Sequence, residues 1–147
     1  MARTARQIGK ASRAKGNRGE LELAHILDNW FMQYSINRTP NSGGLWIPGD
    51  LNGVDWMHIE CKRQETITMG AWIEQASEDC PRGQLPVIMY RKNHMRWRAD
   101  MDLEDFLSIL VVSLDRFDLS PEDIPAETFV EAIAKCQEEF GGGTLCR

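Results

Sequence analysis

The sequence from Gly49 to Arg63 reads Gly-Asp-Leu-Asn-Gly-Val-Asp-Trp-Met-His-Ile-Glu-Cys-Lys-Arg. Residues 56–62 of this stretch alternate with the two-residue period of a β-strand. One face of the predicted strand is apolar and consists of Met57, Ile59 and Cys61. Glu60 and Lys62 lie together on the opposite face. The stretch therefore predicts a carboxylate and an ammonium side by side on a strand that a core can hold.

Two aspartates upstream compete to join Glu60. A two-residue turn at Asn52-Gly53 would pair Asp50 with Asp55. Glu60 would then lie about 17 Å further along the strand, too far for both acids to bind one ion. A wider loop, with the strands paired about residue 55, would instead bring Asp50 opposite Glu60. Isolated aspartates in such turns are usually structural, and the residues alone leave both arrangements open.

Two carboxylates that meet at one point, with a lysine beside them, are typical of metal-dependent phosphodiester hydrolysis. Mg²⁺ prefers hard oxygen ligands, and it activates water while it stabilises the charge that builds on the phosphate. The lysine would hold the phosphate or orient the attacking water. The alternative for Glu60 and Lys62 is an ordinary ion pair on a solvent-facing strand surface.

Gly49-Asp50 followed by Glu60-Cys61-Lys62 resembles the PD-(D/E)xK nuclease signature, with glycine in place of the usual proline. Residues 15–20 and 38–44 further resemble the archaeal-type Holliday junction resolvases and the small bacteriophage nucleases related to them. The resemblance extends over residues 15–98 and does not include the C-terminal part. It favours Asp50 over Asp55, because the family's acid follows proline or glycine at a longer distance from the E-x-K motif.

The resemblance implies a set of functional residues. The catalytic residues would be Glu20, Asp50, Glu60 and Lys62. Mg²⁺, for which Mn²⁺ would substitute, would be bound by Asp50, Glu60, the main-chain carbonyl of Cys61 and, directly or through water, Glu20. DNA would be contacted by Lys15, Arg18, Arg38, Ser42, Arg63 and Gln75. For Gln75, an ordinary solvent-facing side chain is the alternative.

The segment after Asn17 predicts the first helix. Asn17 is a suitable N-cap, and apolar residues then recur at helical spacing at Leu23, Ala24, Leu27, Trp30 and Phe31. Glu20 lies on this inward stripe, and Glu22 lies nearly opposite. Asn17 and Glu20 are spaced as a capping box, which offers a structural explanation for Glu20 beside the metal-binding one.

Charge is distributed unevenly along the chain. The 147 residues have a net charge of −5, yet residues 1–99 contain 14 basic and 10 acidic side chains, whereas residues 100–147 contain 3 basic and 12 acidic. Six lysines and arginines precede Glu20, and no acid does. We expect residues 1–15 to form a flexible basic arm that follows DNA phosphates. A frayed, solvated terminus is the alternative.

Length and composition predict one globular domain. No apolar run approaches the ~20 residues of a membrane span, and the basic N-terminus lacks the apolar region of a secretory signal. The four cysteines have no zinc-ligand spacing and are expected to be free thiols. We therefore expect an intracellular protein without a membrane partner, and the resemblance implies the cytoplasm of a bacterial cell, with a bacteriophage genome as one source.

The expected fold is α/β in the restriction-endonuclease-like order: a helix, a three-stranded β-meander, a crossover helix and two further strands. The first strand would cover residues 32–38. The crossover helix would run from Met69 to Cys80 after a cap at Thr68, with a buried side formed by Trp72, Ile73 and Ala76. The last two strands would cover residues 85–90 and 95–99.

The expected organisation has three parts. Residues 1–15 would be the basic arm, residues 16–100 the nuclease core, and residues 101–147 an acidic helical extension of the same domain. Helices are predicted after Asp102 and after Ser120-Pro121. No catalytic pattern occurs in this C-terminal part.

These patterns together predict a Mg²⁺-dependent deoxyribonuclease. By resemblance, the substrate would be branched DNA such as a four-way junction in DNA recombination. Symmetrical cleavage of a junction needs two active sites, which implies a homodimer. One alternative is a nuclease that acts on linear or nicked DNA. Another is a nuclease-fold DNA-binding accessory protein of recombination or packaging without activity, against which the intact acid–acid–lysine set argues.

Overall fold

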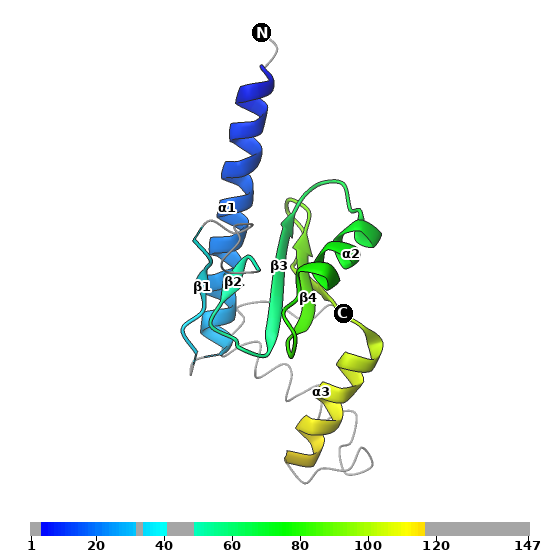
Figure 1. Ribbon diagram of the computed structural model, residues 1–147. Coiled ribbons are helices and arrows are strands. Elements are labelled where there is room, and N and C mark those ends of the chain that lie inside the picture. Colours follow the sequence, from blue (N-terminus) through cyan, green and yellow to red (C-terminus); the bar gives the residue numbers. More distant parts are fainter. Residues whose placement is uncertain (1–3, 32–33, 41–48, 117–147) are drawn as a thin grey trace. The chain divides into compact units, whose positions relative to one another are not determined.

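The computed structural model describes residues 4–31, 34–40 and 49–116 (Figure 1). The chain divides into two compact units, residues 1–101 and residues 102–147. The division follows Met101, one residue from the place where we expect the nuclease core to end. That the second unit is an extension of the same domain stays a prediction.

The first unit is an α/β fold, as predicted. Its elements in chain order are α1 (Ala5–Trp30), β1 (Asn37–Arg38), β2 (Leu51–Asn52), β3 (Met57–Arg63), α2 (Met69–Asp79), β4 (Leu85–Arg91) and β5 (Arg98–Asp100). The strands form one sheet in the order β1-β2-β3-β4-β5. Only β3 and β4 are parallel, and α2 is the crossover between them. The expected meander, crossover helix and two further strands are therefore present, although β1 is shorter than predicted and β5 begins at Arg98 and not at residue 95.

Helix α1 begins much earlier than predicted. Thr4 is its N-cap, and a capping box joins the Thr4 and Gln7 side chains to each other's backbone N–H groups. The expected flexible arm is therefore wrong for residues 5–15, which are helical. The expected capping box at Asn17 and Glu20 is also wrong, because both residues lie inside the helix and not at its start.

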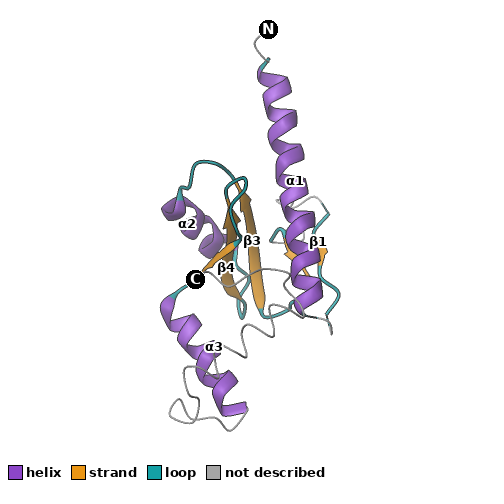
Figure 2. Cartoon of the chain, turned by 180° about the vertical axis from the view of Figure 1, so that it is seen from behind, coloured by secondary structure: helices purple, strands orange, loops and turns teal. Residues whose placement is uncertain are grey.

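Strand β3 is buried on both faces. On one face Ile59 and Met57 pack with Leu23 and Leu27 of α1. On the other face of the sheet, Trp72 and Ala76 of α2 pack against Ile88 of β4. Figures 1 and 2 show the two helices flanking β3 and β4 from opposite views. A solvent-facing strand surface is thereby excluded as the setting of Glu60, which is only 5% exposed.

Within α2, the expected buried side is partly wrong. Trp72 and Ala76 are buried, but Ile73 is 42% exposed. Thr68 occupies the N-cap position without a side-chain hydrogen bond. The helix nevertheless begins and ends within one residue of the predicted range.

The register of β2 and β3 is the one that the wider connecting loop would give. Leu51 pairs with Ile59, and the Asp50 N–H donates to the Ile59 carbonyl over 2.9 Å. The strands are therefore paired about residue 55, which places Asp50 opposite Glu60. Asp55 lies exposed in the connecting turn, where its main-chain carbonyl accepts a hydrogen bond from Gln84 Nε2 over 3.0 Å.

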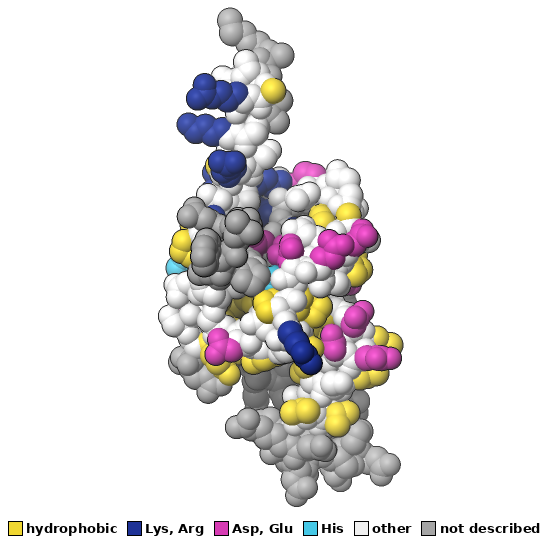
Figure 3. All heavy atoms as spheres, in the orientation of Figure 1, with side chains coloured by type: hydrophobic (Ala, Val, Ile, Leu, Met, Phe, Trp, Pro, Cys, Tyr) yellow, Lys and Arg dark blue, Asp and Glu magenta, His cyan; other side chains and the backbone are white. Residues whose placement is uncertain are grey.

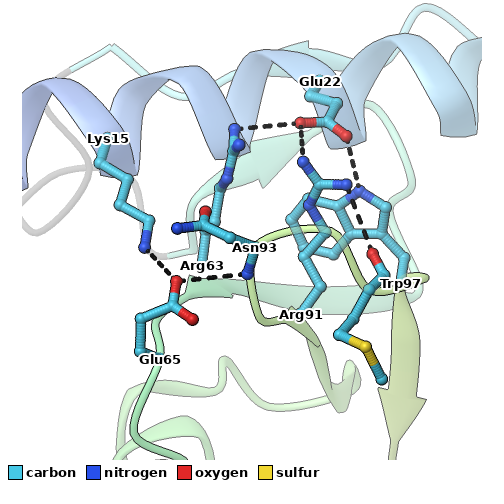
Figure 4. Close-up of polar contacts among 8 residues, drawn as sticks. Lys15, Glu22, Arg63, Glu65, Arg91, Asn93 and Trp97 are labelled. Atoms are coloured by element: carbon cyan, nitrogen blue, oxygen red, sulfur yellow. Dashed lines mark hydrogen bonds and ion pairs between the residues drawn. The ribbon is translucent and has the colours of Figure 1, made fainter.

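A polar cluster attaches α1 to β3 and β4 (Figure 4). Glu22 Oε2 accepts hydrogen bonds from Arg63 over 3.2 Å and from Arg91 over 2.9 Å, and Glu22 Oε1 accepts one from Trp97 over 3.2 Å. The Arg91 guanidinium also lies 5.3 Å from the centre of the Trp97 ring. Gly19 allows α1 to approach β3 this closely, because a Cβ at Gly19 would lie 2.9 Å from Arg63 Cβ.

The second unit contains α3 (Leu103–Arg116) in its described part. The Phe106 N–H donates to the Asp102 carbonyl over 3.0 Å, so the helix begins after Asp102 as predicted. The helix predicted after Ser120-Pro121 lies outside the described residues. Among the helices described here, none has the length and apolar character needed to cross a membrane.

The β2–β3 turn predicts the effect of two matched glycine substitutions. Gly53 has φ of +108°, and a Cβ there would lie 2.3 Å from the Ser35 carbonyl oxygen. Gly53→Ala should therefore lower the free energy of unfolding by roughly 2 kcal/mol or more. The control is Gly70→Ala in α2, where the added Cβ meets open space and should stabilise by about 0.5–1 kcal/mol. Urea denaturation measures both, and equal effects would contradict the observed turn.

Candidate active site

The site is centred on two facing carboxylates. Asp50 precedes β2 and Glu60 lies in the middle of β3, and the register places them opposite each other. Asp50 Oδ2 accepts a hydrogen bond from the Cys61 N–H over 2.9 Å. This bond fixes one oxygen of Asp50 against β3 beside Glu60.

Gly49 explains the departure from the usual proline before this aspartate. Its φ is +84°, whereas proline is held near −65°. A Cβ at this position would also lie 3.3 Å from His58 Nδ1. The backbone that presents Asp50 to β3 is thus one that glycine adopts without strain.

Lys62 points at Glu60 and at α2. Lys62 Nζ donates to Glu60 Oε2 over 2.7 Å and to Gln75 Oε1 over 3.0 Å. Gln75 is an exposed residue, yet its amide reaches toward the site and also donates to Asp79 over 3.5 Å. The carboxylate, the ammonium and the α2 glutamine therefore form one chain of hydrogen bonds.

His58 is a residue of the site that the sequence pattern did not single out. It is 2% exposed, and its Nε2 lies 3.6 Å from Glu60 Oε1. Neither ring nitrogen has a hydrogen-bond partner at normal length among the described residues. Its position two residues before Glu60, on the same strand face, is the one signal in the sequence that could have indicated it.

Glu20 approaches the site from the middle of α1. It is 8% exposed, and it forms an ion pair with the guanidinium of Arg38, at the end of β1. The same guanidinium donates to Asn17 Oδ1 over 3.2 Å. Asn17 and Glu20, one helical turn apart, therefore hold Arg38 together.

Burial and mutual repulsion shape the electrostatics of the two acids. Burial raises the pKa of Asp50, and the negative charges of Glu60 and Glu20 raise it further. The hydrogen bond from the Cys61 N–H and the charge of Lys62 lower this pKa, but they do not cancel the rise. Burial also opposes the charge of Glu60, but contacts with His58 and Lys62 outweigh it and hold the pKa of Glu60 below its ordinary value. The neighbours of Glu60 therefore favour its ionised form. Asp50 has too little positive charge nearby, so its ionised form is disfavoured.

The Cys61 side chain is not a nucleophile at neutral pH. Burial raises the pKa of its thiol, and the nearby charges of Asp50 and Glu20 raise it further. What Cys61 contributes in this structure is its main-chain N–H to Asp50. Metal binding by its carbonyl oxygen stays a prediction.

The residues expected to contact DNA are placed differently from one another. Arg18 is exposed on α1, whereas Lys15 donates to Glu65 over 2.8 Å, and this contact contributes most to holding the pKa of Glu65 below its ordinary value. Arg63 is bound by Glu22, which gives it a structural role (Figure 4). Ser42 lies outside the described residues. DNA contact by each of these residues stays a prediction.

The oxygen-rich side chains of the site fit a divalent cation of the Mg²⁺ class. Within residues 4–31, 34–40 and 49–116, no three His, Cys, Asp or Glu side chains converge closely enough to enclose an ion by themselves. Mg²⁺ does not need such an enclosure, because one or two carboxylates commonly bind it while it keeps several waters. Asp50 and Glu60 provide those two carboxylates, and their repulsion is the energy that a cation would relieve.

Because the pKa values of Asp50 and Glu60 are shifted in opposite directions, neutralising each acid should have opposite effects on the stability of the metal-free protein. Because the pKa of Asp50 is raised, its ionisation at neutral pH destabilises the fold, and this penalty disappears as pH falls through the raised pKa toward 3.8. Because the pKa of Glu60 is lowered, its charge stabilises the fold above the ordinary value of 4.5 and is lost as pH falls through the lowered pKa. At pH 7 in EDTA, Asp50→Asn should raise Tm and Glu60→Gln should lower it. Differential scanning calorimetry measures both, and shifts in the same direction would contradict this charge balance.

Comparison with known proteins agrees with this geometry. The family described as "Phage putative PDDEXK endonuclease" matches residues 11–124, which include α1 from residue 11 onward, the whole sheet, both acids and the lysine. No curated protein and no solved structure matches the chain. The match covers well over half of the 147 residues, and the chain belongs to this phage PD-(D/E)xK endonuclease family.

Proposed function

We propose that this protein hydrolyses DNA phosphodiester bonds in a metal-dependent reaction at Asp50, Glu60 and Lys62. Membership of the nuclease family supports the reaction class. The observation that carries the proposal is the β2–β3 register, which sets Asp50 opposite Glu60. Lys62 lies 2.7 Å from the same glutamate, so the acid–acid–lysine set is assembled at one point of the sheet.

Each residue has a distinct role in the proposed reaction. Asp50 and Glu60 hold the cation, with the Cys61 main chain beside them. A bound Mg²⁺ or Mn²⁺ supplies activation of water and neutralisation of charge on the phosphate. Lys62, held between Glu60 and Gln75, donates to the attacking water or to the phosphate oxygens where negative charge develops.

Glu20 and Arg38 form the outer part of the proposed site. Arg38 occupies one carboxylate oxygen of Glu20, so Glu20 contributes through water more readily than by direct binding of the ion. The Arg38 side chain remains 27% exposed, so a phosphate can contact it. Arg18 adds a second, exposed cation on α1.

Substitution of the central residues tests the catalytic assignment. Glu60→Gln and Asp50→Asn remove the charge that holds the cation, and Lys62→Ala removes the donor to the developing charge. Each should reduce cleavage of a synthetic four-way junction in Mg²⁺ by at least about a hundredfold, while circular dichroism stays that of the folded protein. The Mg²⁺-induced rise in Tm of the wild type should be absent in Asp50→Asn.

Asp55→Asn is the matched control for these variants. Asp55 is a neighbouring aspartate that lies exposed in the turn, and its substitution should leave cleavage within about twofold. Loss of cleavage in Asp55→Asn together with normal cleavage in Asp50→Asn would overturn the assignment of the metal ligand.

For the substrate, we propose branched DNA, cut by a homodimer that presents two active sites. The resemblance of residues 15–20 and 38–44 to the junction-resolving enzymes supports this choice. Two copies are needed because symmetrical resolution cuts two strands of the junction, and each cut requires its own site.

A cleavage assay tests the substrate. A synthetic four-way junction, a linear duplex of the same sequence and a single strand are each incubated with Mg²⁺, Mn²⁺ or EDTA. Paired cuts confined to the junction, in either metal but not in EDTA, are the expected result. Equal cutting of the linear duplex would retain the nuclease and discard the junction. Binding without any cutting would indicate a DNA-binding accessory protein.

A further inference from the structure

The first half of α1 carries a straight stripe of positive charge. Arg6, Lys10 and Arg13 follow one another at intervals of four and three residues, so they share one face of the helix. All three are exposed. Figure 3 shows lysine and arginine side chains gathered along this part of α1, which extends past the sheet in Figure 1.

The stripe continues into the candidate active site. Asn17 and Glu20 come four and seven residues after Arg13, on the same face of α1. These two residues bind Arg38, and Glu20 is close enough to Asp50 for the two charges to interact. A ligand that follows the stripe along α1 is therefore led to the two carboxylates.

The helix makes the stripe a track of defined length. The capping box at Thr4 sets the start of the helix ahead of Arg6. At the rise of an α-helix, the fourteen positions from Arg6 to Glu20 span about 21 Å. Duplex DNA rises 3.4 Å per base pair, so the track corresponds to about six base pairs.

Helix stability does not explain the positive charges. Cations near a helix N-terminus oppose the macrodipole, yet the first turn contains no acid and Arg6 lies within it. From Thr4 to Gly19 the chain contains no aspartate or glutamate that would pair with these cations. The stripe therefore suits an external polyanion.

The composition of the stripe favours duplex over single-stranded DNA. Residues 4–19 contain no aromatic side chain, although aromatic stacking is the usual means of holding single-stranded bases. Gly9 and Ala14 beside the stripe are small and exposed, and a Cβ at Gly9 would meet open space, so a sugar–phosphate backbone has room to approach. Such a surface contacts phosphates without reading bases.

We propose that Arg6, Lys10 and Arg13 form a rigid track for a duplex arm of the substrate and set its direction into the active site. This inference rests on the proposed function, because it names how the same site receives its DNA. The site therefore requires about six base pairs of duplex on one side of the scissile phosphate. Shorter or single-stranded flanks lose the contacts to the track.

Salt dependence of binding tests the three contacts. Arg6→Gln, Lys10→Gln and Arg13→Gln are combined in the Glu60→Gln background, and binding of a fluorescent 20-base-pair duplex is measured by anisotropy between 50 and 200 mM NaCl. The slope of log K against log salt is negative, and loss of three phosphate contacts reduces its magnitude by about 2.7. The charge-matched control combines Arg82→Gln, Lys92→Gln and Arg96→Gln, which are exposed elsewhere in the same unit. An unchanged slope in the α1 variant, or an equal fall in the control, overturns the track.

Helical phase distinguishes a rigid track from a flexible arm. Two alanines inserted between Ala14 and Lys15 rotate the stripe by about 200° away from Asn17 and Glu20, whereas four alanines rotate it by about 40°. The two-residue insertion should reduce the slope as much as the triple variant does, and the four-residue insertion should largely restore it. Equal slopes for both insertions would indicate a flexible arm and overturn the rigid track.

These measurements separate the track from the proposed chemistry. If the wild type cuts no DNA with any metal but binds duplex with the expected slope, the proposed hydrolysis fails and the track stands. If the wild type cuts DNA, but at the same rate on duplex flanks of three and of twelve base pairs, the track fails and the hydrolysis stands.

Discussion

The central constraint in this structure is the burial of charged side chains on β3. Glu60 is only 5% exposed, and a buried carboxylate without partners would cost several kcal/mol. Lys62 and His58 offset that cost at Glu60, and the Cys61 N–H offsets part of it at Asp50. A shift of one residue in the register would turn these side chains into the apolar face beneath α1. The charges and the register therefore require each other.

Helix α1 serves three different purposes along its length. Its C-terminal half places Leu23, Ala24 and Leu27 in the core. In its middle, Glu22 binds Arg63 and Arg91, and thereby attaches the helix to β3 and β4. Glu20, two residues earlier, approaches the acids, so the cluster around Glu22 determines where Glu20 lies. The net charge of −5 conceals the basic first half of the same helix.

Much of the fold followed from local patterns. The two-residue period of β3, the crossover helix and the order of the elements were all predicted and observed. The start of α1 was missed, although Thr4 and Gln7 have the spacing of a capping box. The role of Glu22 was missed for a different reason: its partners Arg91 and Trp97 are 69 and 75 residues away along the chain, and helical periodicity contains no information about them.

For the site, the sequence by itself determined which residue types are present and which family the chain belongs to. Gly49-Asp50 and Glu60-Cys61-Lys62 were sufficient for that, because a signature depends on order and spacing along the chain. Only the tertiary structure decided that Asp50, and not Asp55, faces Glu60. The Asn52-Gly53 turn signal is local, whereas the register depends on β2 pairing with both β1 and β3 and on Gly53 packing against the Ser35 carbonyl. The free energy of those long-range contacts exceeds the preference of a two-residue turn, so no local pattern could have determined the register.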